Sequence, residues 1–375
     1  MRNDVDIVII GAGVVGCAIA RELSIKYPDR NMVVLDKLGE AGLETSSRNS
    51  GVLHSGIHQN PTFLKSHLAI RGSKLAASYA KEKELHILDS GMLVVVGIGS
   101  ILGGLYKELN SLWNLIKNAR KQWIKLKFLT YFGIKELAPN IKALAGIFIP
   151  EVWVVDPLEF TQSLKKDAQI NGVKFYFYSP VIKIRKQKDK YEVFTNHSWF
   201  ATSVVINCAG LYADDIAGIA GFNNYTIYPW RGEYYEVIGK KRDLVRRLVY
   251  PVVSSKFPSK GIHFSPRTDG RLFIGPNARL VPNKTYYKED KTPVEIFLEH
   301  AQKYLPQLTG EDLIWAYSGI RPKTTETAEE SDFIISVDNK NPAFVNLIGI
   351  ESPGLASSMA IAEYVYELLK TTHAL

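Results

Sequence analysis

The stretch VDIVIIGAGVVG at residues 5–16 decides the fold. Its first six residues have the length and β-branched content of a strand that is buried on both faces. Residues 15–23 form a helical pattern, so the glycines make a turn between a strand and a helix. Gly11 permits the tight turn, Gly13 lets the backbone approach a pyrophosphate, and Gly16 allows the helix to pack closely on the strand. This order predicts a dinucleotide site at the helix N-terminus.

A second apolar run, residues 32–35, ends at Asp36, twenty residues after Gly16. A carboxylate at this place accepts hydrogen bonds from the hydroxyls of an adenosine ribose. The acid also disfavours a ribose that carries a 2′-phosphate. We therefore expect an unphosphorylated dinucleotide.

Composition limits the class of protein. The chain has 375 residues, of which 46% are hydrophobic and 22% are charged, as in ordinary globular proteins with a large core. Cys17 and Cys208 both lie in apolar segments, so we expect neither a disulfide framework nor a metal site. The first strand begins at Val5, and no apolar run reaches the length of a membrane span. We expect a cytoplasmic protein without an N-terminal signal.

The formal net charge of +8 gathers in part at residues 105–129, which we expect to form one basic amphipathic helix. Six cations stand there against the single acid Glu108: Lys107, Lys117, Arg120, Lys121, Lys125 and Lys127. Such a helix can dock peripherally on the anionic inner face of a membrane, where a quinone is within reach. It can equally pack its apolar stripe on the domain and leave the cations in solvent, which is the interpretation we favour. Nucleic-acid binding is not expected, because no recognition motif accompanies the charge.

The order of the elements indicates two domains. Strands and helices alternate at both ends of the chain, whereas residues 226–274 show mostly strand patterns with expected turns at Gly232, Pro251, Gly261 and Gly270. We expect a Rossmann-like α/β domain from residues 1–85, 140–222 and 319–375. An inserted α+β domain with a mainly antiparallel sheet is expected from residues 86–139 and 223–318.

Further glycine turns favour a flavin dinucleotide over a nicotinamide one. They follow apolar runs at residues 208–210 and 349–354, so a long cofactor can contact several strand ends. Residues 44–51, ETSSRNSG, supply hydroxyls, a guanidinium and an amide for a second phosphate and a ribitol. Residues 352–358 begin a helix whose partial positive charge would stabilise negative charge on the cofactor.

Several longer strings carry a family resemblance: SSRNSGVLHSGIHQNPTFLKS (46–66), WRGEYYEV (230–237), FPSKGIHFSPRTDGRLFIGPNA (257–278), SGIRPK (318–323) and GIESPGLASSMAIAEYV (349–365). Together they resemble FAD-dependent oxidoreductases of the D-amino-acid-oxidase fold, in particular the L-2-hydroxyglutarate dehydrogenases and oxidases. The resemblance covers almost the whole chain. It implies non-covalent FAD and hydride transfer from a substrate carbon to flavin N5.

On this resemblance, the FAD-binding residues would come from every strand end of the first domain. They are Gly11, Gly13, Val14, Val15, Gly16, Asp36, Lys37, Thr45, Ser46, Ser47, Arg48, Asn49, Ser50, Val181, Ala209, Gly210, Gly319, Arg321, Gly354, Leu355, Ala356 and Ser357.

The chemistry of an anionic 2-hydroxy acid requires cations for its carboxylates and a neutral histidine to accept the hydroxyl proton. The candidate catalytic residues are His54, His58, His263 and Arg321. The candidate substrate ligands are Gln59, Lys65, Arg231, Tyr235, Arg267 and Lys323. Tyr234 and Tyr235 alternate along a strand, so at most one of them faces the site.

The exact substrate has alternatives. His58-Gln59 stands where the L-2-hydroxyglutarate group usually carries Tyr-Tyr, and SGIRP and the 349–365 string also resemble FAD-dependent glycerol 3-phosphate dehydrogenases. The chain lacks the lysine-containing glycine turn and extra C-terminal domain of the long bacterial members of that group. We rank a 2-hydroxy acid first, glycerol 3-phosphate second and an amino acid third. A quinone or another acceptor would take the electrons.

Overall fold

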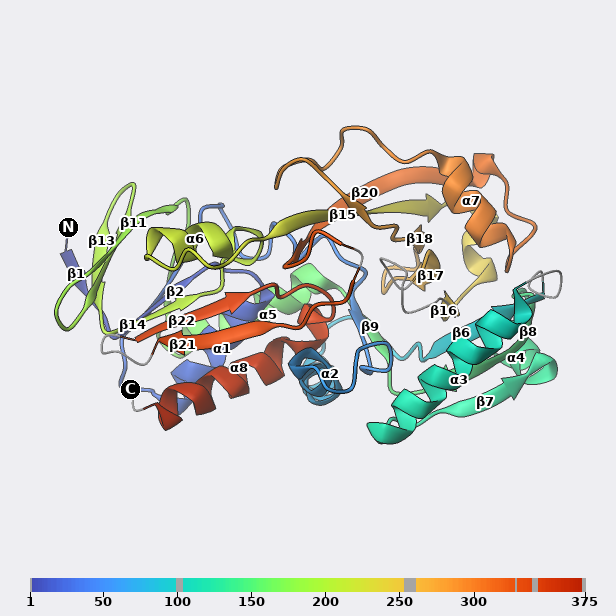
Figure 1. The fold of residues 1–375 in the computed structure, drawn as a ribbon, viewed down its shortest axis with the longest axis horizontal. Coiled ribbons are helices and arrows are strands. Elements are labelled where there is room, and N and C mark those ends of the chain that lie inside the picture. Colours follow the sequence, from blue (N-terminus) through green and yellow to red (C-terminus); the bar gives the residue numbers. More distant parts are fainter. Residues whose placement is uncertain (1, 99–103, 253–260, 328, 339–342, 373–375) are drawn as a thin grey trace.

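The computed structural model describes residues 2–98, 104–252, 261–327, 329–338 and 343–372. Its strands form four sheets. Figure 1 shows an elongated molecule in which a parallel sheet with its helices occupies one half and a large antiparallel sheet the other. Both chain termini lie at the end of the first half. Segments from both ends of the sequence therefore build the half that contains the glycine turn.

The six-stranded sheet carries the glycine turn. Its strands, in spatial order, are β10 (Lys174–Tyr176), β3 (Met32–Leu35), β2 (Ile7–Ile10), β14 (Val204–Asn207), β22 (Ala343–Ile348) and β21 (Ile334–Asp338). All neighbours pair in parallel except β21 with β22. Every residue of β2, β3 and β14 is buried, as expected for strands covered on both faces.

Helices cover one face of this sheet and a second sheet covers the other. The helices are α1 (Val14–Lys26), α2 (Leu64–Glu82), α5 (Pro157–Ile170) and α8 (Gly354–Thr371). The covering sheet contains β1 (Arg2–Asp4), β13 (Trp199–Thr202), β12 (Tyr191–Thr195) and β11 (Val181–Lys186), and η2 (Gly210–Tyr212) leads into α6 (Ala213–Ile219) beside it. At the start of α5 the Asp156 carboxylate accepts from the Leu158 and Glu159 amides, and Pro157 occupies the first helical position.

The nine-stranded sheet is mainly antiparallel. Its strands are β19 (Arg279–Leu280), β15 (Tyr228–Val237), β18 (Leu272–Gly275), β17 (His263–Pro266), β16 (Leu248–Pro251), β6 (Met92–Gly97), β8 (Ala143–Ile149) and β7 (Lys127–Thr130), with β20 (Leu313–Lys323) paired to β15. We expected residues 143–149 in the first domain, but they pair with β6 and β7 as β8. The exact domain boundaries stay a prediction.

The remaining described elements are a three-stranded sheet between the two halves, two short 3-10 helices and the helices that cover the nine-stranded sheet. A three-stranded sheet joins β4 (Val52–Leu53), β9 (Trp153–Val155) and β5 (Ile87–Leu88). Short 3-10 helices are η3 (Gly239–Leu244) and η4 (Gly310–Asp312). Helices α4 (Tyr131–Leu137) and α7 (Val294–Gln302) pack on one face of the nine-stranded sheet, and α3 (Leu105–Lys121) packs on the other. Among the described residues, no helix is long and apolar enough to cross a membrane.

The basic segment is not one helix to residue 129, as we expected, because α3 ends at Lys121. Trp123 adopts a left-handed conformation with φ of 56°. The Ile124 amide then donates to the Ala119 carbonyl, and the Trp123 amide donates to the Arg120 carbonyl. These two bonds close the helix C-terminus in a Schellman motif. The chain beyond it pairs with β8 as the edge strand β7.

Candidate active site

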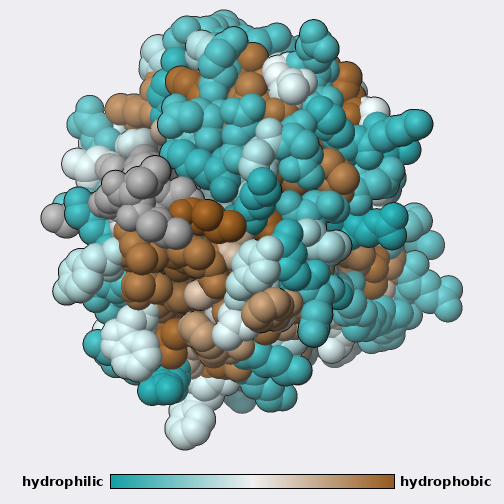
Figure 2. Space-filling view, turned by 90° about the vertical axis from the view of Figure 1, so that its right-hand side faces the viewer, coloured by the Kyte–Doolittle hydropathy of each residue, from teal (hydrophilic) through white to brown (hydrophobic). Residues whose placement is uncertain are grey.

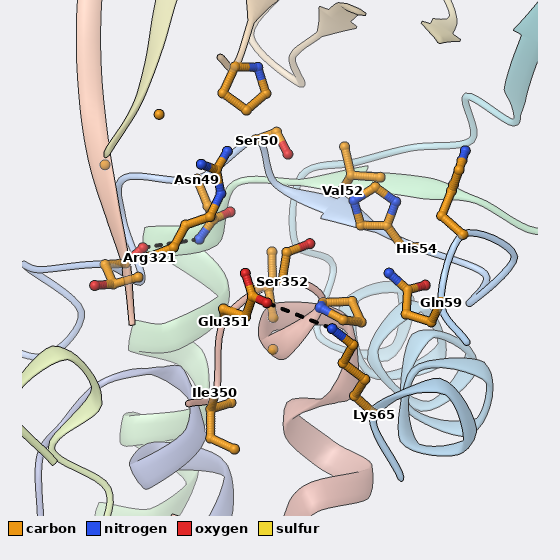
Figure 3. Close-up of a pocket in the computed structure, with 18 of the residues that line it drawn as sticks. Asn49, Ser50, Val52, His54, Gln59, Lys65, Arg321, Ile350, Glu351 and Ser352 are labelled. Atoms are coloured by element: carbon orange, nitrogen blue, oxygen red, sulfur yellow. Dashed lines mark hydrogen bonds and ion pairs between the residues drawn. The ribbon is translucent and has the colours of Figure 1, made fainter. Parts of the chain in front are cut away.

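One cavity of about 530 Å³ lies where the two halves meet. Its wall brings together the glycine turn, residues 45–54, the start of α2, parts of β15, β16, β17 and β20, residues 350–355 and one side of α3. Figure 3 shows Arg321 and Asn49 on one side of this cavity, His54, Gln59 and Lys65 on the other, and Glu351 and Ser352 between them. The cavity is the candidate active site.

The glycine turn borders the cavity through Gly13, Val14 and Val15. Gly11 has a φ of 105°, and a Cβ on it would come 2.4 Å from the Cys208 carbonyl oxygen. A Cβ on Gly16 would come 2.0 Å from the Gly11 carbonyl oxygen. Neither position therefore accepts a side chain, which agrees with the roles expected from the glycine spacing.

Asp36 braces the same turn. Its Oδ2 accepts from the Ala12 amide at 2.6 Å, and its Oδ1 accepts from the Leu38 amide at 2.8 Å. Burial raises the pKa of Asp36 even though these two hydrogen bonds act in the opposite direction. The acid thus links the end of β3 to the turn, and its expected role at an adenosine ribose stays a prediction.

The loop that follows β3, residues 44–51, folds against the glycine turn. Ser46 Oγ accepts from the Val14 amide at 2.9 Å, and Asn49 Nδ2 donates to the Ser46 carbonyl at 2.7 Å. Arg267 donates to the Asn49 carbonyl at 2.9 Å and to the Tyr317 hydroxyl at 2.7 Å. The polar segment is held at the cavity wall by the chain itself.

The expected cofactor residues divide into two groups. Those that line the cavity are Gly13, Val14, Val15, Thr45, Ser46, Arg48, Asn49, Ser50, Gly210, Gly319, Arg321, Gly354 and Leu355. Those outside its lining are Gly11, Gly16, Asp36, Lys37, Ser47, Val181, Ala209, Ala356 and Ser357. Lys37 lies 3.2 Å from the Tyr212 ring centroid, and Val181 begins β11 in the covering sheet.

All three candidate histidines line the cavity, and Tyr250 lies among them. The Tyr250 ring stacks on His263 at 3.7 Å between centroids and lies 6.1 Å from His54 and 5.8 Å from His58. His263 Nδ1 lies 2.9 Å from the Gly261 carbonyl oxygen. Because a carbonyl only accepts, Nδ1 carries a proton, and in the neutral imidazole Nε2 is then the nitrogen with the lone pair.

Tyr250 is a site residue that the sequence analysis missed. It lies on β16, whose parallel pairing with β6 has no local signal in the sequence. Its hydroxyl is buried and has no hydrogen-bond partner among the described residues. Burial, with a smaller contribution from Tyr234, raises the pKa of Tyr250 well above its usual value, so the hydroxyl stays protonated and can donate.

Arg321 enters the cavity from β20. Its Nη2 donates to the Asn277 carbonyl at 3.3 Å, and its buried Nη1 has no hydrogen-bond partner among the described residues. Gly232, expected at a turn, instead lies in the middle of β15 opposite Gly319. A Cβ there would come 2.7 Å from Arg321 Nη2. The glycine thus leaves room for the guanidinium.

Two lysines also line the cavity, but both already have partners. Lys65 Nζ lies 3.0 Å from Glu330 and 3.7 Å from Glu351, and its side chain is 2% exposed. Lys323 Nζ donates to the Thr327 and Glu329 carbonyls. Burial lowers the pKa of Lys323, while the charge of Glu351 opposes that shift.

Three expected substrate ligands lie outside the cavity lining. Arg231 is fully buried, donates to the Glu289 and Asp290 carbonyls and lies 3.4 Å from Glu233. Tyr235 packs on Phe297.

Tyr235 also donates to the Thr292 carbonyl, while its neighbour Tyr234 lines the cavity. The register of β15 against β20 shifts between these two tyrosines, so alternation alone did not identify the inward one. Arg267, the third of these ligands, braces the loop at Asn49 and does not reach the cavity.

A family model described as FAD dependent oxidoreductase matches residues 6–368. The chain belongs to this family of flavoenzymes, and FAD is its cofactor. A glycerol 3-phosphate dehydrogenase from Caloramator mitchellensis is 32% identical over 97% of this chain and 74% of its own length. An L-2-hydroxyglutarate dehydrogenase from Arabidopsis thaliana is 30% identical over 97% of this chain and 83% of its own length.

The solved structures include the FAD-bound L-alpha-glycerophosphate oxidase from Mycoplasma pneumoniae, which is 29% identical. It superposes with a TM-score of 0.87 over 98% of this chain and 95% of its own. A glycine oxidase from Geobacillus kaustophilus shares the fold with a TM-score of 0.82 at 21% identity, covering 98% of this chain and 95% of its own. The flavoenzyme fold expected from the sequence is confirmed.

The cavity wall fits FAD. The N-cap residues Gly13 of α1 and Pro353 of α8 both lie in the lining, and Ser46 Oγ accepts from the first amide of α1, that of Val14. Two helix N-termini with amide donors therefore point toward one cavity, which suits a pyrophosphate at one of them and an electron-rich ring at the other. Ser357 Oγ, near the start of α8, is buried without a hydrogen-bond partner among the described residues.

Proposed function

We propose that this enzyme oxidises a secondary alcohol on a small substrate that carries one anionic group, with glycerol 3-phosphate as the first candidate. The buried Arg321 carries the proposal, because its Nη1 has no hydrogen-bond partner among the described residues, whereas Lys65 and Lys323 are held by carboxylates or carbonyls. A guanidinium suits a phosphate or a carboxylate. The 32% identical glycerol 3-phosphate dehydrogenase supports the choice.

The reaction converts a CH–OH group into a carbonyl. The hydroxyl proton goes to a neutral histidine of the Tyr250 cluster, and His263 is the first candidate because its Nε2 is in the accepting tautomer. Arg321 binds the anionic group and orients the alcohol, and the Tyr250 hydroxyl donates to a substrate oxygen. FAD, when bound, supplies the two-electron acceptor for the hydride that leaves the same carbon.

L-2-hydroxyglutarate is the second candidate. Several relatives of this chain, at 26–30% identity, bear the name of that dehydrogenase. A second carboxylate would have to replace Glu330 at Lys65, where the ion pair measures 3.0 Å. The substrate would therefore break the ion pair of a buried lysine that glycerol 3-phosphate leaves intact, which is why we rank L-2-hydroxyglutarate below glycerol 3-phosphate.

The electrons need a final acceptor, for which we propose a quinone or another small oxidant. This proposal is supported by α3, where Asn110, Asn114 and Asn118 line the cavity and Trp113 on another side of the same helix is exposed. A cytoplasmic location at the inner face of the membrane follows from the same surface and is also a proposal.

Anaerobic titration of the FAD-loaded enzyme tests the substrate. We expect glycerol 3-phosphate to bleach the flavin absorbance at lower concentration than L-2-hydroxyglutarate. The reverse order would favour the second candidate, and no bleaching by either compound would contradict both. The Gln variants of His54, His58 and His263 then identify the base, because loss of the acidic limb of the kcat/KM pH profile marks the residue that accepts the proton.

A further inference from the structure

The described residues expose seven large aromatic side chains, and six of them lie in the short segment 106–132. Tyr106, Trp123 and Phe132 are 84%, 92% and 77% exposed. We call this surface the basic aromatic face and define it by Tyr106, Trp113, Trp123, Phe128, Tyr131 and Phe132, together with Lys107, Lys117, Arg120, Lys121, Lys125 and Lys127. α3 and α4 pack on opposite faces of the nine-stranded sheet, so these rings surround its edge strand β7. Monomeric soluble proteins rarely expose so many aromatic rings at one end.

Figure 2 looks at the end of the molecule that carries α3, α4 and β7. Hydrophobic residues form a broad brown area in its lower half, whereas the upper half is mostly hydrophilic. The apolar character is therefore concentrated on one side of this end. In Figure 1, α3, α4 and β7 lie in the lower part of the same end, so the apolar area is on the side of the molecule that bears the exposed aromatic residues.

Helix α3 has three distinct faces. Leu112, Ile116 and Ala119 pack into the core beneath the sheet, and Asn110, Asn114 and Asn118 line the cavity. At 100° per residue, Trp113, Lys117 and Arg120 share a third face that points away from both. Lys117 and Arg120 each lie 5.8 Å from the Trp113 ring centroid, so the cations surround an aromatic residue.

The positive charge of the basic aromatic face favours an anionic binding partner. Of its six cations, only Lys125 forms an ion pair within the described part of the chain, with Glu151 at 3.1 Å. A second copy of the chain docked through the same face would place like charges against like charges. A surface of phosphate headgroups over an apolar layer instead matches both the lysines and the exposed rings.

We infer that the basic aromatic face binds the surface of an anionic lipid bilayer. Trp113 and Trp123 would lie at the headgroup level, Phe128 and Phe132 would reach the acyl boundary, and the lysines would pair with lipid phosphates. The asparagines on another face of the same helix then place the cavity wall one helix away from the bilayer. The delivery of electrons to an acceptor dissolved in the lipid rests on the proposed function, whereas the binding itself does not.

Vesicle sedimentation of the FAD-loaded protein tests the binding. We expect sedimentation with phosphatidylcholine vesicles that contain one-third phosphatidylglycerol and little with phosphatidylcholine alone. Binding should fall at about 1 M salt, where the screening length is about 3 Å. Equal binding to both vesicle types, or none to either, would overturn the inference.

A charge-reversal triplet identifies the face. Lys117→Glu with Arg120→Glu and Lys121→Glu should lower the partition coefficient at least about 100-fold, since each cation near an anionic surface contributes roughly fivefold. The matched control, Lys174→Glu with Lys183→Glu and Lys188→Glu, changes the net charge equally at exposed sites elsewhere. Equal losses in both triplets would show that only net charge matters and would contradict a defined face.

An aromatic pair completes the test. Trp123 and Tyr178 are both exposed and both left-handed, with φ of 56° and 51°. Trp123→Ser should lower vesicle binding about tenfold, and Tyr178→Ser should leave it unchanged. If Trp123→Ser instead abolished a dimer seen without vesicles, the face would be a contact between copies and the inference would be wrong.

Activity separates this inference from the proposed function. Both Trp123→Ser and the charge-reversal triplet should keep wild-type turnover with a water-soluble dye acceptor and lose turnover with a quinone embedded in vesicles. If the wild-type enzyme showed no turnover with the dye, that result would contradict the proposed function alone. The inference of membrane binding would stand, because vesicle sedimentation needs no substrate.

Discussion

The absence of a side chain at Gly232 makes room for the side chain of Arg321. The Arg321 guanidinium occupies the space where a Cβ of Gly232 would lie, 2.7 Å from Nη2. Register pairing places Gly232 against Gly319, so neither strand contributes a side chain at this step of the β15–β20 ladder. The room for the guanidinium thus comes from backbone geometry.

We predict that Gly232→Ala raises KM for the anionic substrate about tenfold or more, because the guanidinium must move by several tenths of an ångström. FAD content should not change. Steady-state kinetics and the flavin absorbance ratio measure the two effects. Gly310→Ala is the control, since a Cβ there would meet nothing within 4 Å. Unchanged KM in Gly232→Ala would remove Arg321 from substrate binding.

Tyr250 has a buried polar atom that the folded chain leaves available. Its hydroxyl lies in the cavity wall without a hydrogen-bond partner among the described residues, so Tyr250→Phe breaks no bond that the folded chain makes. We expect the free energy of unfolding of Tyr250→Phe to stay within about 0.5 kcal/mol of wild type. KM should rise about fivefold or more, if the hydroxyl donates to the substrate as proposed. Denaturant melts and kinetics measure both, and an unchanged KM would exclude that donation.

At the scale of elements, α2 is capped from far away in the sequence. The N-cap residue Phe63 makes no side-chain hydrogen bond to the helix, and the Asp332 carboxylate instead accepts from the Leu64 and Lys65 amides at 2.6 and 2.9 Å. The same segment brings Glu330 to Lys65. The cap therefore holds both the helix and a charged part of the cavity wall.

We predict that Asp332→Ala lowers the free energy of unfolding by about 1–2 kcal/mol and also raises KM, because the segment with Glu330 loosens. Asp156→Ala is the control, since it removes the local cap of α5 away from the cavity. It should cost similar stability and leave KM unchanged. Chemical denaturation and kinetics compare the two variants, and parallel changes in KM would contradict the specific role of Asp332.

Glu233 on β15 predicts a pH dependence of stability. Burial alone would raise its pKa, but hydrogen bonds from Thr292 and Asn277 and the charge of Arg231 outweigh burial and hold the pKa of Glu233 below its usual value. A lowered pKa favours the folded state above the unfolded value of 4.5. This contribution is lost as the pH falls through the folded pKa.

Glu233→Gln should therefore lower the free energy of unfolding at pH 7 by about 3 kcal/mol, since it leaves the Arg231 charge buried without its partner. The difference from wild type should shrink below about pH 4. Glu236→Gln on the same strand breaks a partly exposed pair with Arg271 and should cost less than about 1 kcal/mol at either pH. A pH-independent difference would contradict the ionic origin.

At the scale of the whole molecule, the cavity joins segments from both halves of the chain. A ligand that contacts these segments stabilises the folded state through mass action. FAD at about 1,000 times its dissociation constant should add about 4 kcal/mol to the free energy of unfolding of the apoprotein. FMN lacks the adenosine part that the Gly11–Gly16 turn is expected to hold, so it should add clearly less. Equal melting shifts with FAD and FMN would contradict an adenosine site at that turn.

Local patterns carried much of the architecture. The buried run before Gly11 and the spacing to Asp36 depend on neighbouring residues, so they could be predicted. The predicted end of the basic helix was wrong because Trp123 ends α3 in a left-handed conformation. Glycine is the residue that usually marks such a helix end in a sequence. β8 was misplaced because strand pairing over long sequence distances leaves no local pattern.

Some residues of the site could be predicted from the sequence and others could not. Arg321 and the three histidines could be chosen by chemistry, because cations and neutral imidazoles are what an anionic alcohol needs. The exclusion of Arg231 and Tyr235 could not be foreseen, since it depends on which side of β15 faces the cavity and on a shift in its register.

The sequence by itself determined the dinucleotide turn, the flavin family and the chemical types that the site contains, because these depend on short spacings and on the residues themselves. Only the tertiary structure decided that Tyr250 lies among the histidines, that Gly232 makes room for Arg321 and that carboxylates hold Lys65. It also decided that the aromatic residues beside α3 are exposed. Burial and proximity depend on strand pairing between distant segments, which a linear pattern does not contain.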